Sequence, residues 1–229
     1  MNELVIIVEG ETEKTFVRDQ LAAYLALRNT VTWAVLPGRH RNHGGVRKWE
    51  GARQDILRTL KEGRYCSTMF DYYAMPTDWP GRSDAGSRPW NERARFVEEQ
   101  VHADITAAMG DSFDPKFFVP YVQLHEFEAL AFADVGVLAS VVAPLGQSSS
   151  DWLRQQFTDI LHQAGHPEAI NDSYETCPSR RIGAMVPAYR KRVLGPIVTR
   201  RIGIEVLRSQ CTHFGAWLSR LEQIDGERE

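Results

Sequence analysis

The sequence predicts an α/β fold in which a mainly parallel β-sheet is flanked by helices. The first observation is the run Leu4–Val8, which is apolar, rich in β-branched residues and unbroken. Such a run is typical of a strand that is buried on both faces, as in a parallel sheet. The second observation is that strand-like and helix-like segments alternate along the first half of the chain. This alternation favours right-handed crossovers between parallel strands.

Each element of the first half has its own local signals. The first strand is expected to end at Gly10 and to lead into a helix over Glu13–Leu27, with Thr12 as its N-cap. Pro37 and Gly38 then end the strand that follows this helix. The other expected elements are strand Val31–Leu36, helix Arg47–Lys61, strand Tyr65–Phe70, helix Trp90–Met109 and strand Phe117–Val122.

Beyond Asp134 the character of the chain changes, and helical patterns dominate. The helices expected there are Trp152–Gln163, Ile182–Val193, Gly203–Arg208 and Thr212–Ile224. We therefore expect residues 1–134 to form the α/β core and residues 135–229 to form a helical C-terminal part packed on it.

The bulk composition is that of an ordinary globular protein, with 43% hydrophobic and 25% charged residues. A net charge of −3 argues against a protein that coats nucleic acid by bulk electrostatics. No apolar stretch is long enough to span a bilayer and no signal peptide is apparent, so a cytoplasmic location is the expectation. Cys66, Cys177 and Cys211 are far apart in the sequence, which predicts reduced, structural thiols.

Carboxylates gather where the first strand is expected to end. Glu9, Glu11 and Glu13 follow the apolar run, and the segment contains neither GxGxxG nor GxxxxGK[ST], so no phosphate cradle is indicated. Three carboxylates beside a helix N-terminus repel one another unless a cation shares them. A hard divalent metal ion is the natural partner of such oxygen ligands.

Asp71 stands at the end of the third expected strand. If that strand is a parallel neighbour of the first, Glu9 and Asp71 lie together at the carboxyl edge of the sheet, where open α/β folds bind ligands. We therefore expect the two carboxylates to be close enough to share one hydrated cation. Asp78 and Asp84, in the loop that follows, are alternatives for a further carboxylate at the site, but a solvated loop is the favoured interpretation for both.

Two further segments have acidic or metal-binding residue types. His125 and Glu128 are three residues apart, so on a helix they would share a face, which suits a metal site or a general base. The alternative is a hydrogen-bonded pair that holds a strand–helix junction. Cys211 and His213 are too few ligands to indicate zinc, and core or capping roles are expected for them.

Several motifs resemble known families. The segment VEGETE followed by KTFV resembles the first motif of the Toprim domain, the metal-dependent fold of topoisomerases, primases and OLD-type nucleases, and it is most similar to the OLD-like branch. A family of Toprim-like proteins often encoded beside AAA-type ATPases has HEFEAL, PSxRI and CPHFxxWL segments. The similar stretches here are Gln123–Asp134, Pro178–Ile182 and Cys211–Leu218, so the resemblance spans nearly the whole chain.

The resemblance implies a Toprim-like core and a nuclease that depends on Mg²⁺ or Mn²⁺. Glu9 would be a metal ligand or general base, and Glu13 and Asp71 would be metal ligands. Glu126 or Glu128 would support a second ion or orient a water molecule, and Lys191 would neutralise developing charge. Toprim domains have a DxD pair where this chain reads Asp71-Tyr72-Tyr73, which puts a full two-metal site in doubt.

The resemblance also implies an AAA-type ATPase partner and a role in defence against phage. Nucleic acid would be held by clustered basic residues, of which Arg39, Arg41, Arg180 and Arg181 are the candidates. These arginines have alternative roles as solvated residues or as an assembly surface for the ATPase. The alternative function is a catalytically inactive regulatory or scaffold subunit that binds such an ATPase. The sequence leaves open whether DNA or RNA is cut and whether the chain forms a homodimer.

Overall fold

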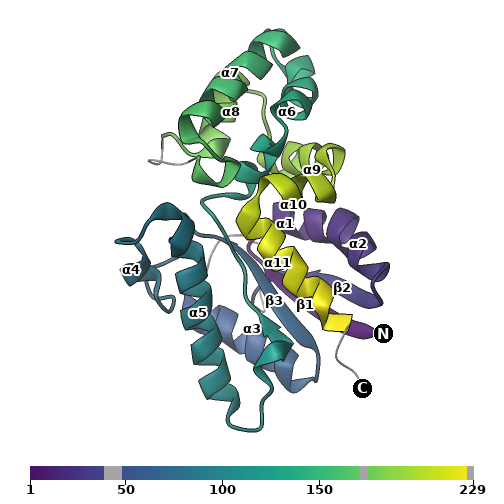
Figure 1. Cartoon of the computed structure of the whole chain (residues 1–229), viewed down its shortest axis with the longest axis vertical. Helices are drawn as coiled ribbons and strands as arrows, with labels where there is room; N and C mark the ends of the chain where they lie inside the picture. Colours follow the sequence, from purple (N-terminus) through teal and green to yellow (C-terminus); the bar gives the residue numbers. More distant parts are fainter. Residues whose placement is uncertain (39–47, 171–174, 226–229) are drawn as a thin grey trace.

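The computed structural model describes residues 1–38, 48–170 and 175–225. Its centre is a parallel sheet with the strand order β2-β1-β3-β4, and β5 continues beyond β4 as a second, short partner of β3 (Figure 1). The strands are β1 (Asn2–Val8), β2 (Thr30–Val35), β3 (Tyr65–Asp71), β4 (Phe118–Val119) and β5 (Val122–Gln123). All pairings are parallel, which confirms the expected fold class.

The strand expected over Phe117–Val122 is in fact two short strands. Val119 pairs with Ser67, and pairing with β3 resumes where Val122 lies opposite Phe70. Pro120 stands between the two strands and has no backbone N–H to donate, so it interrupts the ladder. The consequence is that β5 pairs separately with the last two residues of β3.

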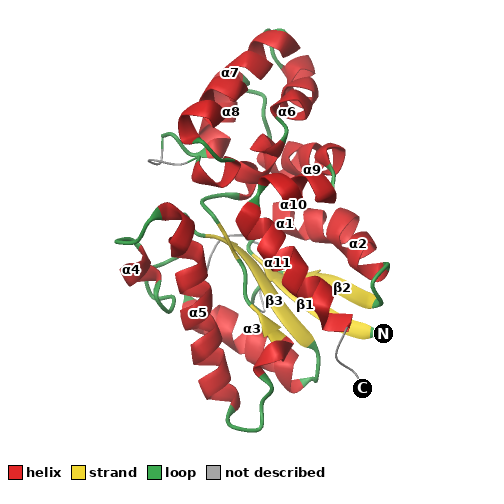
Figure 2. Cartoon of the chain, in the orientation of Figure 1, coloured by secondary structure: helices red, strands yellow, loops and turns green. Residues whose placement is uncertain are grey.

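Helices cover both faces of the sheet (Figure 2). On one face, Leu4, Ile6 and Val8 pack with residues of the first helix and with Trp217 in one hydrophobic core. On the other face, side chains of β1 and β3 pack with two long helices in a second core. The helices that form these layers are α1 (Glu11–Phe16), the π-helical turn Val17–Leu21, α2 (Ala22–Ala26), α3 (Trp49–Lys61), α5 (Trp90–Met109) and α11 (Thr212–Glu222).

The first helix differs from its expected start. Helical structure begins at Glu11 and its N-cap is Gly10, which has no side chain to form a capping hydrogen bond. Thr12 lies inside the first turn and is buried, so the prediction that Thr12 caps the helix was wrong. The apolar spacing was informative about the buried face, but it could not locate the first turn.

The remaining helices lie between the HEFEAL segment and α11. Figure 1 shows α6, α7 and α8 gathered at one end of the molecule, whereas α9 and α10 lie beside the first helix. The helices are α6 (Val135–Val142), α7 (Ser150–Ala164), α8 (Pro178–Met185), α9 (Lys191–Ile202) and α10 (Ile204–Gln210), and the short α4 (Arg82–Ala85) lies in the loop before α5. The helix expected over Ile182–Val193 is two helices, because Pro187 disfavours helix at the residue before it. The division at residue 134 stays a prediction.

Two further expectations concern the whole chain. All three cysteines are free and buried, as expected for structural thiols. Within the described residues, no single helix is both long and apolar enough to cross a membrane; one sharply bent pair, Phe127–Ala133 with Val135–Leu145, meets the criteria of length and composition only when taken together.

Candidate active site

The first two carboxylates of the site come from neighbouring strands. β1 and β3 are parallel, and Val8 lies opposite Met69, so Glu9 and Asp71 follow at the same edge of the sheet. The backbone N–H of Asp71 donates to Oε2 of Glu9 over 3.0 Å. This contact confirms that the two residues lie side by side at the carboxyl ends of adjacent strands.

Glu13 joins them from the first turn of α1. A Cβ atom at Gly10 would lie 3.2 Å from Oε2 of Glu13, so glycine lets this carboxylate lie against the turn between strand and helix. Glu13 is buried, and burial raises its pKa, an effect partly offset by backbone hydrogen bonds and by the charges of Lys191 and Arg192.

A third acidic segment reaches the same edge from β5. The backbone at His125 is left-handed, with φ of 63°, and Glu126 is extended. A 3₁₀-helix then begins at Phe127 and places Glu128 in the interior with an exposed fraction of 0%. His125 therefore lies outside the helix, and the prediction that His125 and Glu128 share a helical face was wrong. We refer to Glu9, Glu13, Asp71, Glu126 and Glu128 as the acidic edge.

Glu126 differs from the other members because its carboxylate is fully engaged. Its Oε2 accepts from the backbone N–H of Ser179 over 3.0 Å, and its Oε1 accepts from the Ser179 hydroxyl over 3.1 Å. Ser179 is in the first turn of α8, so Glu126 caps that helix where a negative charge is favoured. By its contacts Glu126 has a structural role.

Lys191 supplies a positive charge to the acidic edge. It is the first residue of α9, and that helix packs closely on its neighbours at Gly195, where a Cβ atom would lie 3.4 Å from both Phe127 and Thr12. Burial lowers the pKa of Lys191, but the negative charges of Glu128, Asp71 and the other carboxylates raise it by more. Lys191 is therefore held as a cation among the carboxylates.

The carboxylates themselves are electrostatically strained. Burial, together with the charge of Glu13, raises the pKa of Glu9 to about 7. Burial and the nearby charges raise the pKa of Glu128 to about 8 and that of Asp71 well above its usual range. Among the residues that the structure describes, Oδ1 of Asp71 and both oxygens of Glu128 have no hydrogen-bond partner of ordinary geometry. One positive charge from Lys191 does not balance this set.

The donor chemistry of the acidic edge fits a hard divalent cation. Its oxygens are carboxylates, the ligands that Mg²⁺ and Mn²⁺ prefer, and the buried oxygens of Asp71 and Glu128 are available for coordination. Within the described ranges, no three His, Cys, Asp or Glu side chains already lie close enough together to coordinate one ion. Binding would therefore require the carboxylates to draw together around the cation.

The structure describes two of the four arginines that the sequence analysis named as nucleic-acid-binding residues. Nε of Arg181 donates to the backbone oxygen of Thr176 over 2.6 Å, within the turn before α8. The backbone N–H of Arg180 contacts the oxygen of Cys177 in the same turn. Arg39 and Arg41 lie outside the described residues. The charge of Arg192 lowers the pKa of Glu13, so Arg192, one of the clustered basic residues of the sequence, is a cation near the site.

Tyr189 was missed by the sequence analysis. Its ring is buried, and burial, the charges of Glu128 and Glu126 and a contact with the Glu128 carboxylate raise the pKa of its hydroxyl. Tyr189 lies two residues before Lys191 in the sequence, so the Tyr-Arg-Lys-Arg run was the one signal available. Asp78, by contrast, accepts from the backbone N–H of Trp49 at the start of α3, in agreement with its expected absence from the site.

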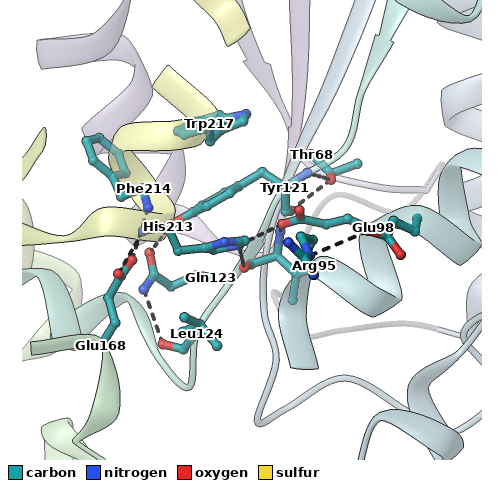
Figure 3. Close-up of polar contacts among 12 residues, drawn as sticks. Thr68, Arg95, Glu98, Tyr121, Gln123, Leu124, Glu168, His213, Phe214 and Trp217 are labelled. Atoms are coloured by element: carbon teal, nitrogen blue, oxygen red, sulfur yellow. Dashed lines mark hydrogen bonds and ion pairs between the residues drawn. The ribbon is translucent and has the colours of Figure 1, made fainter. Parts of the chain in front are cut away.

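A second group of buried carboxylates gathers around His213 (Figure 3). Glu98 accepts from the backbone N–H of Val122 over 2.7 Å and lies 2.8 Å from Nε2 of His213. The carboxylate of Glu168 accepts from the backbone N–H groups of His213 and Phe214 over 2.9 and 3.0 Å. We refer to Glu98, Glu168 and His213 as the capping cluster.

The capping cluster joins α11 to the sheet. The ring of Tyr121 stacks on Trp217 with 4.3 Å between centroids and also on His213 (Figure 3). Nε1 of Trp217 donates to the Ser67 hydroxyl in β3. Cys211 is buried directly before α11. Cys211 and His213 therefore have the core and capping roles expected for them.

Comparison with known proteins gives a family and two structural likenesses. The model of a family described as "Domain of unknown function (DUF4276)" matches residues 8–222. The C-terminal region of the Burkholderia pseudomallei OLD protein superposes with a TM-score of 0.47 and 13% identity over 98% of this chain and 99% of that chain. The C-terminal region of the Xanthomonas campestris pv. campestris OLD protein superposes with a TM-score of 0.45 and 13% identity over 97% of this chain and 95% of that chain. No curated protein matches the sequence significantly. Likenesses of this size do not by themselves define a function.

Proposed function

The chain belongs to the DUF4276 family, and we propose that its acidic edge is the catalytic centre of a divalent-metal-dependent nuclease. The observation that carries the proposal is the set of buried carboxylate oxygens on Asp71 and Glu128 that, among the described residues, make no hydrogen bond of ordinary geometry. Buried carboxylates of this kind are costly for stability, and perturbed pKa values concentrate at functional sites. Their position at the carboxyl edge of a parallel sheet is where such folds bind ligands.

Glu9, Glu13 and Asp71 are the residues that would hold the metal ion, with Glu128 behind them. A bound Mg²⁺ or Mn²⁺ ion would polarise the phosphodiester and lower the pKa of a coordinated water molecule. The protein contributes the positions of the ligands: the hydrogen bond from Asp71 orients Glu9, and Gly10 lets Glu13 lie against the same turn.

The remaining chemistry belongs to side chains of this chain. If Glu9 is a general base rather than a ligand, its pKa of about 7 suits it to accept a proton near neutral pH. Lys191 is held as a cation beside the carboxylates, so its ammonium group can offset the negative charge of a phosphate that approaches them. Arg192 adds a second positive charge on the side of Glu13.

The proposal extends to the biological setting. The resemblance of the HEFEAL, PSRRI and CTHFGAWL segments to proteins encoded beside AAA-type ATPases supports an ATPase partner and a role in defence against phage. Together with the resemblance of the VEGETE segment to the first Toprim motif, these segments are the sequence support for the nuclease activity. The substrate class is DNA or RNA.

The test is a cleavage assay with purified protein. Single- and double-stranded DNA and RNA are incubated with Mg²⁺ or Mn²⁺, with and without EDTA, and with and without an ATPase encoded beside the gene. We expect cleavage that EDTA abolishes and that Asp71→Asn and Glu9→Gln reduce by at least about 100-fold. Asp151→Asn, which removes a carboxylate that is 94% exposed on α7, is the matched control. Cleavage by Asp71→Asn and Glu9→Gln at the rate of the parent would refute the proposal.

The alternative is a catalytically inactive subunit that regulates or supports an ATPase. Two observations favour it: Tyr73 stands where Toprim domains have their second aspartate, and no three potential ligands in the described part of the chain are arranged around one point. Calorimetric titration with Mg²⁺ separates the two functions. Specific binding that is lost in Glu9→Gln supports the nuclease, whereas no binding and no cleavage support the inactive subunit.

A further inference from the structure

The two edges of the sheet differ in how they are protected. The strand order places β2 at one edge and β4 at the other, and Figure 2 shows β2 at the border of the yellow sheet. β4 has only two residues, and Pro115, Lys116 and Pro120 lie within three residues of it. Short length, lysine and proline are features that keep an edge strand from pairing with another chain.

Within the strand itself β2 has none of these features, although Arg28 and Pro37 lie two residues from its ends. It is six residues long, TVTWAV, with no charged residue, no proline and no glycine. Its register with β1 is regular over all six residues, so no bulge turns the edge away. Among the described strands only β1 pairs with β2, and the outer backbone groups therefore face away from the sheet.

The side chains of β2 also leave apolar surface exposed. Thr30 and Thr32 are buried beneath the first helix, whereas Trp33, on the opposite face, is 43% exposed. Only the guanidinium of Arg64, 6.0 Å from the Trp33 ring centroid, lies over it among the described cation–ring contacts. Leu27, which is 85% exposed, precedes the strand by three residues. A long, uncharged edge with an exposed tryptophan is a surface that proteins normally cover.

We propose that β2 pairs with β2 of a second copy of this chain, in antiparallel orientation, so that two sheets join into one. The strand is complementary to itself because it has no charge, so two copies can align without repulsion between like charges. Residues opposite each other in an antiparallel pair must point to the same face, which leaves two centred registers. In one, Trp33 lies opposite Trp33; in the other, Thr32 lies opposite Thr32, and Val31 lies opposite Trp33.

This arrangement is independent of the proposed nuclease activity. Because the two β2 strands run in opposite directions, the carboxyl edges of the two sheets point away from each other. Neither acidic edge then contributes a residue to the other. The dimer can therefore be present or absent whatever the acidic edge does, and its test requires no activity measurement.

The first experiment measures molar mass in solution. Light scattering behind size-exclusion chromatography on the full chain, at micromolar concentrations, is expected to give twice 26.0 kDa. Trp33→Lys brings two charges together at the centre of the pair and should raise the dimer dissociation constant by at least about tenfold. Trp152→Lys, at a tryptophan that is 47% exposed on α7, is the matched control and should leave the dimer intact.

The second experiment places the contact. Trp33→Cys should be joined to its own copy by a short bismaleimide, whereas Trp152→Cys and the parent, whose three cysteines are buried, should not. A parent that is monomeric would overturn the proposal and leave the edge to a strand of another protein. A dimer that persists in Trp33→Lys and is not joined through Trp33→Cys would also overturn it, because the two copies would then meet through another surface.

Discussion

The acidic edge and the capping cluster both contain buried carboxylates, but the two groups differ in how well those carboxylates are hydrogen-bonded. Glu168 has an exposed fraction of 0%, and each of its oxygens accepts a backbone N–H from α11. Glu128 is equally buried, but within the described residues neither of its oxygens makes a hydrogen bond of ordinary geometry, and the nearby hydroxyl of Tyr189 is its closest substitute for one. A buried carboxylate with its hydrogen bonds satisfied contributes to stability, whereas one without them reduces it. The difference separates residues that hold this fold together from residues that are available to a ligand.

The largest effect should come from removing the satisfied carboxylate. Glu168→Ala would leave the backbone N–H groups of His213 and Phe214 buried without acceptors and would also remove the cap of α11. We expect the free energy of unfolding to fall by about 3 kcal/mol, measured by urea denaturation. Glu168→Gln keeps one acceptor and should lose about half as much. An unchanged stability of Glu168→Ala would show that the capping cluster does not hold α11 to the sheet.

At the acidic edge we expect that removing a buried carboxylate raises the free energy of unfolding instead of lowering it. Glu128 has a pKa of about 8 in the folded chain, against an ordinary value of 4.5. Between these values the folded state binds a proton that the unfolded state has lost, so stability falls as the pH rises. Glu128→Gln removes this loss, and we expect it to be about 2 kcal/mol more stable than the parent at pH 8, measured by thermal or urea denaturation without metal.

The same substitution has an internal control. Near pH 4, where the glutamate is protonated in both states, the parent and Glu128→Gln should have similar stability. A variant that is less stable than the parent at pH 8 would show that Glu128 is satisfied in solution. In that case the contrast between the two carboxylate groups would disappear.

The sequence was sufficient to predict that Glu9 and Asp71 lie together at the acidic edge. Glu9 and Asp71 each follow an apolar β-run, and strand ends in a parallel sheet are predictable from such runs and the turns after them. The role of Glu126 was not predictable, because it depends on Ser179, which lies 53 residues away in the sequence. The fold class followed from periodicity, whereas the break at Pro120 and the left-handed backbone at His125 depend on local strain that spacing does not show.

The capping cluster could not have been predicted as a unit. Glu98 and His213 are separated by 115 residues, and Glu168 lies between them in the chain. Nothing in the local pattern around Glu98 distinguishes it from an exposed helical glutamate such as Glu99. Their contact exists only because α5 and α11 meet at β5, which is a property of the tertiary structure.

His213 provides a pH test of the capping cluster. Burial lowers the pKa of His213, but the adjacent Glu98 raises it by more, so the net pKa in the folded state is above the ordinary value of 6.5. Stability from this pair is therefore fully present below pH 6.5 and is lost as the pH rises through the folded pKa. The penalty of His213→Gln should be about 1 kcal/mol greater at low pH than at high pH, because the charge-assisted hydrogen bond exists only at low pH. A penalty that is the same at both pH values would mean that His213 is neutral throughout.

The smallest change in stability is expected from altering the contacts of Glu126, which shares features with both the acidic edge and the capping cluster. It lies at the acidic edge, yet both of its oxygens contact Ser179, as in the capping cluster. Ser179→Ala removes the hydroxyl contact and keeps the backbone N–H, so the free energy of unfolding should fall by only about 0.5–1 kcal/mol. Ser179→Ala leaves one oxygen of Glu126 without its partner. Two measurements on this variant therefore decide the role of Glu126: its free energy of unfolding and its affinity for Mg²⁺, measured by calorimetry. An unchanged affinity assigns Glu126 to the structure of α8, whereas a higher affinity shows that the released oxygen binds the cation and that Glu126 belongs with Glu9 and Asp71.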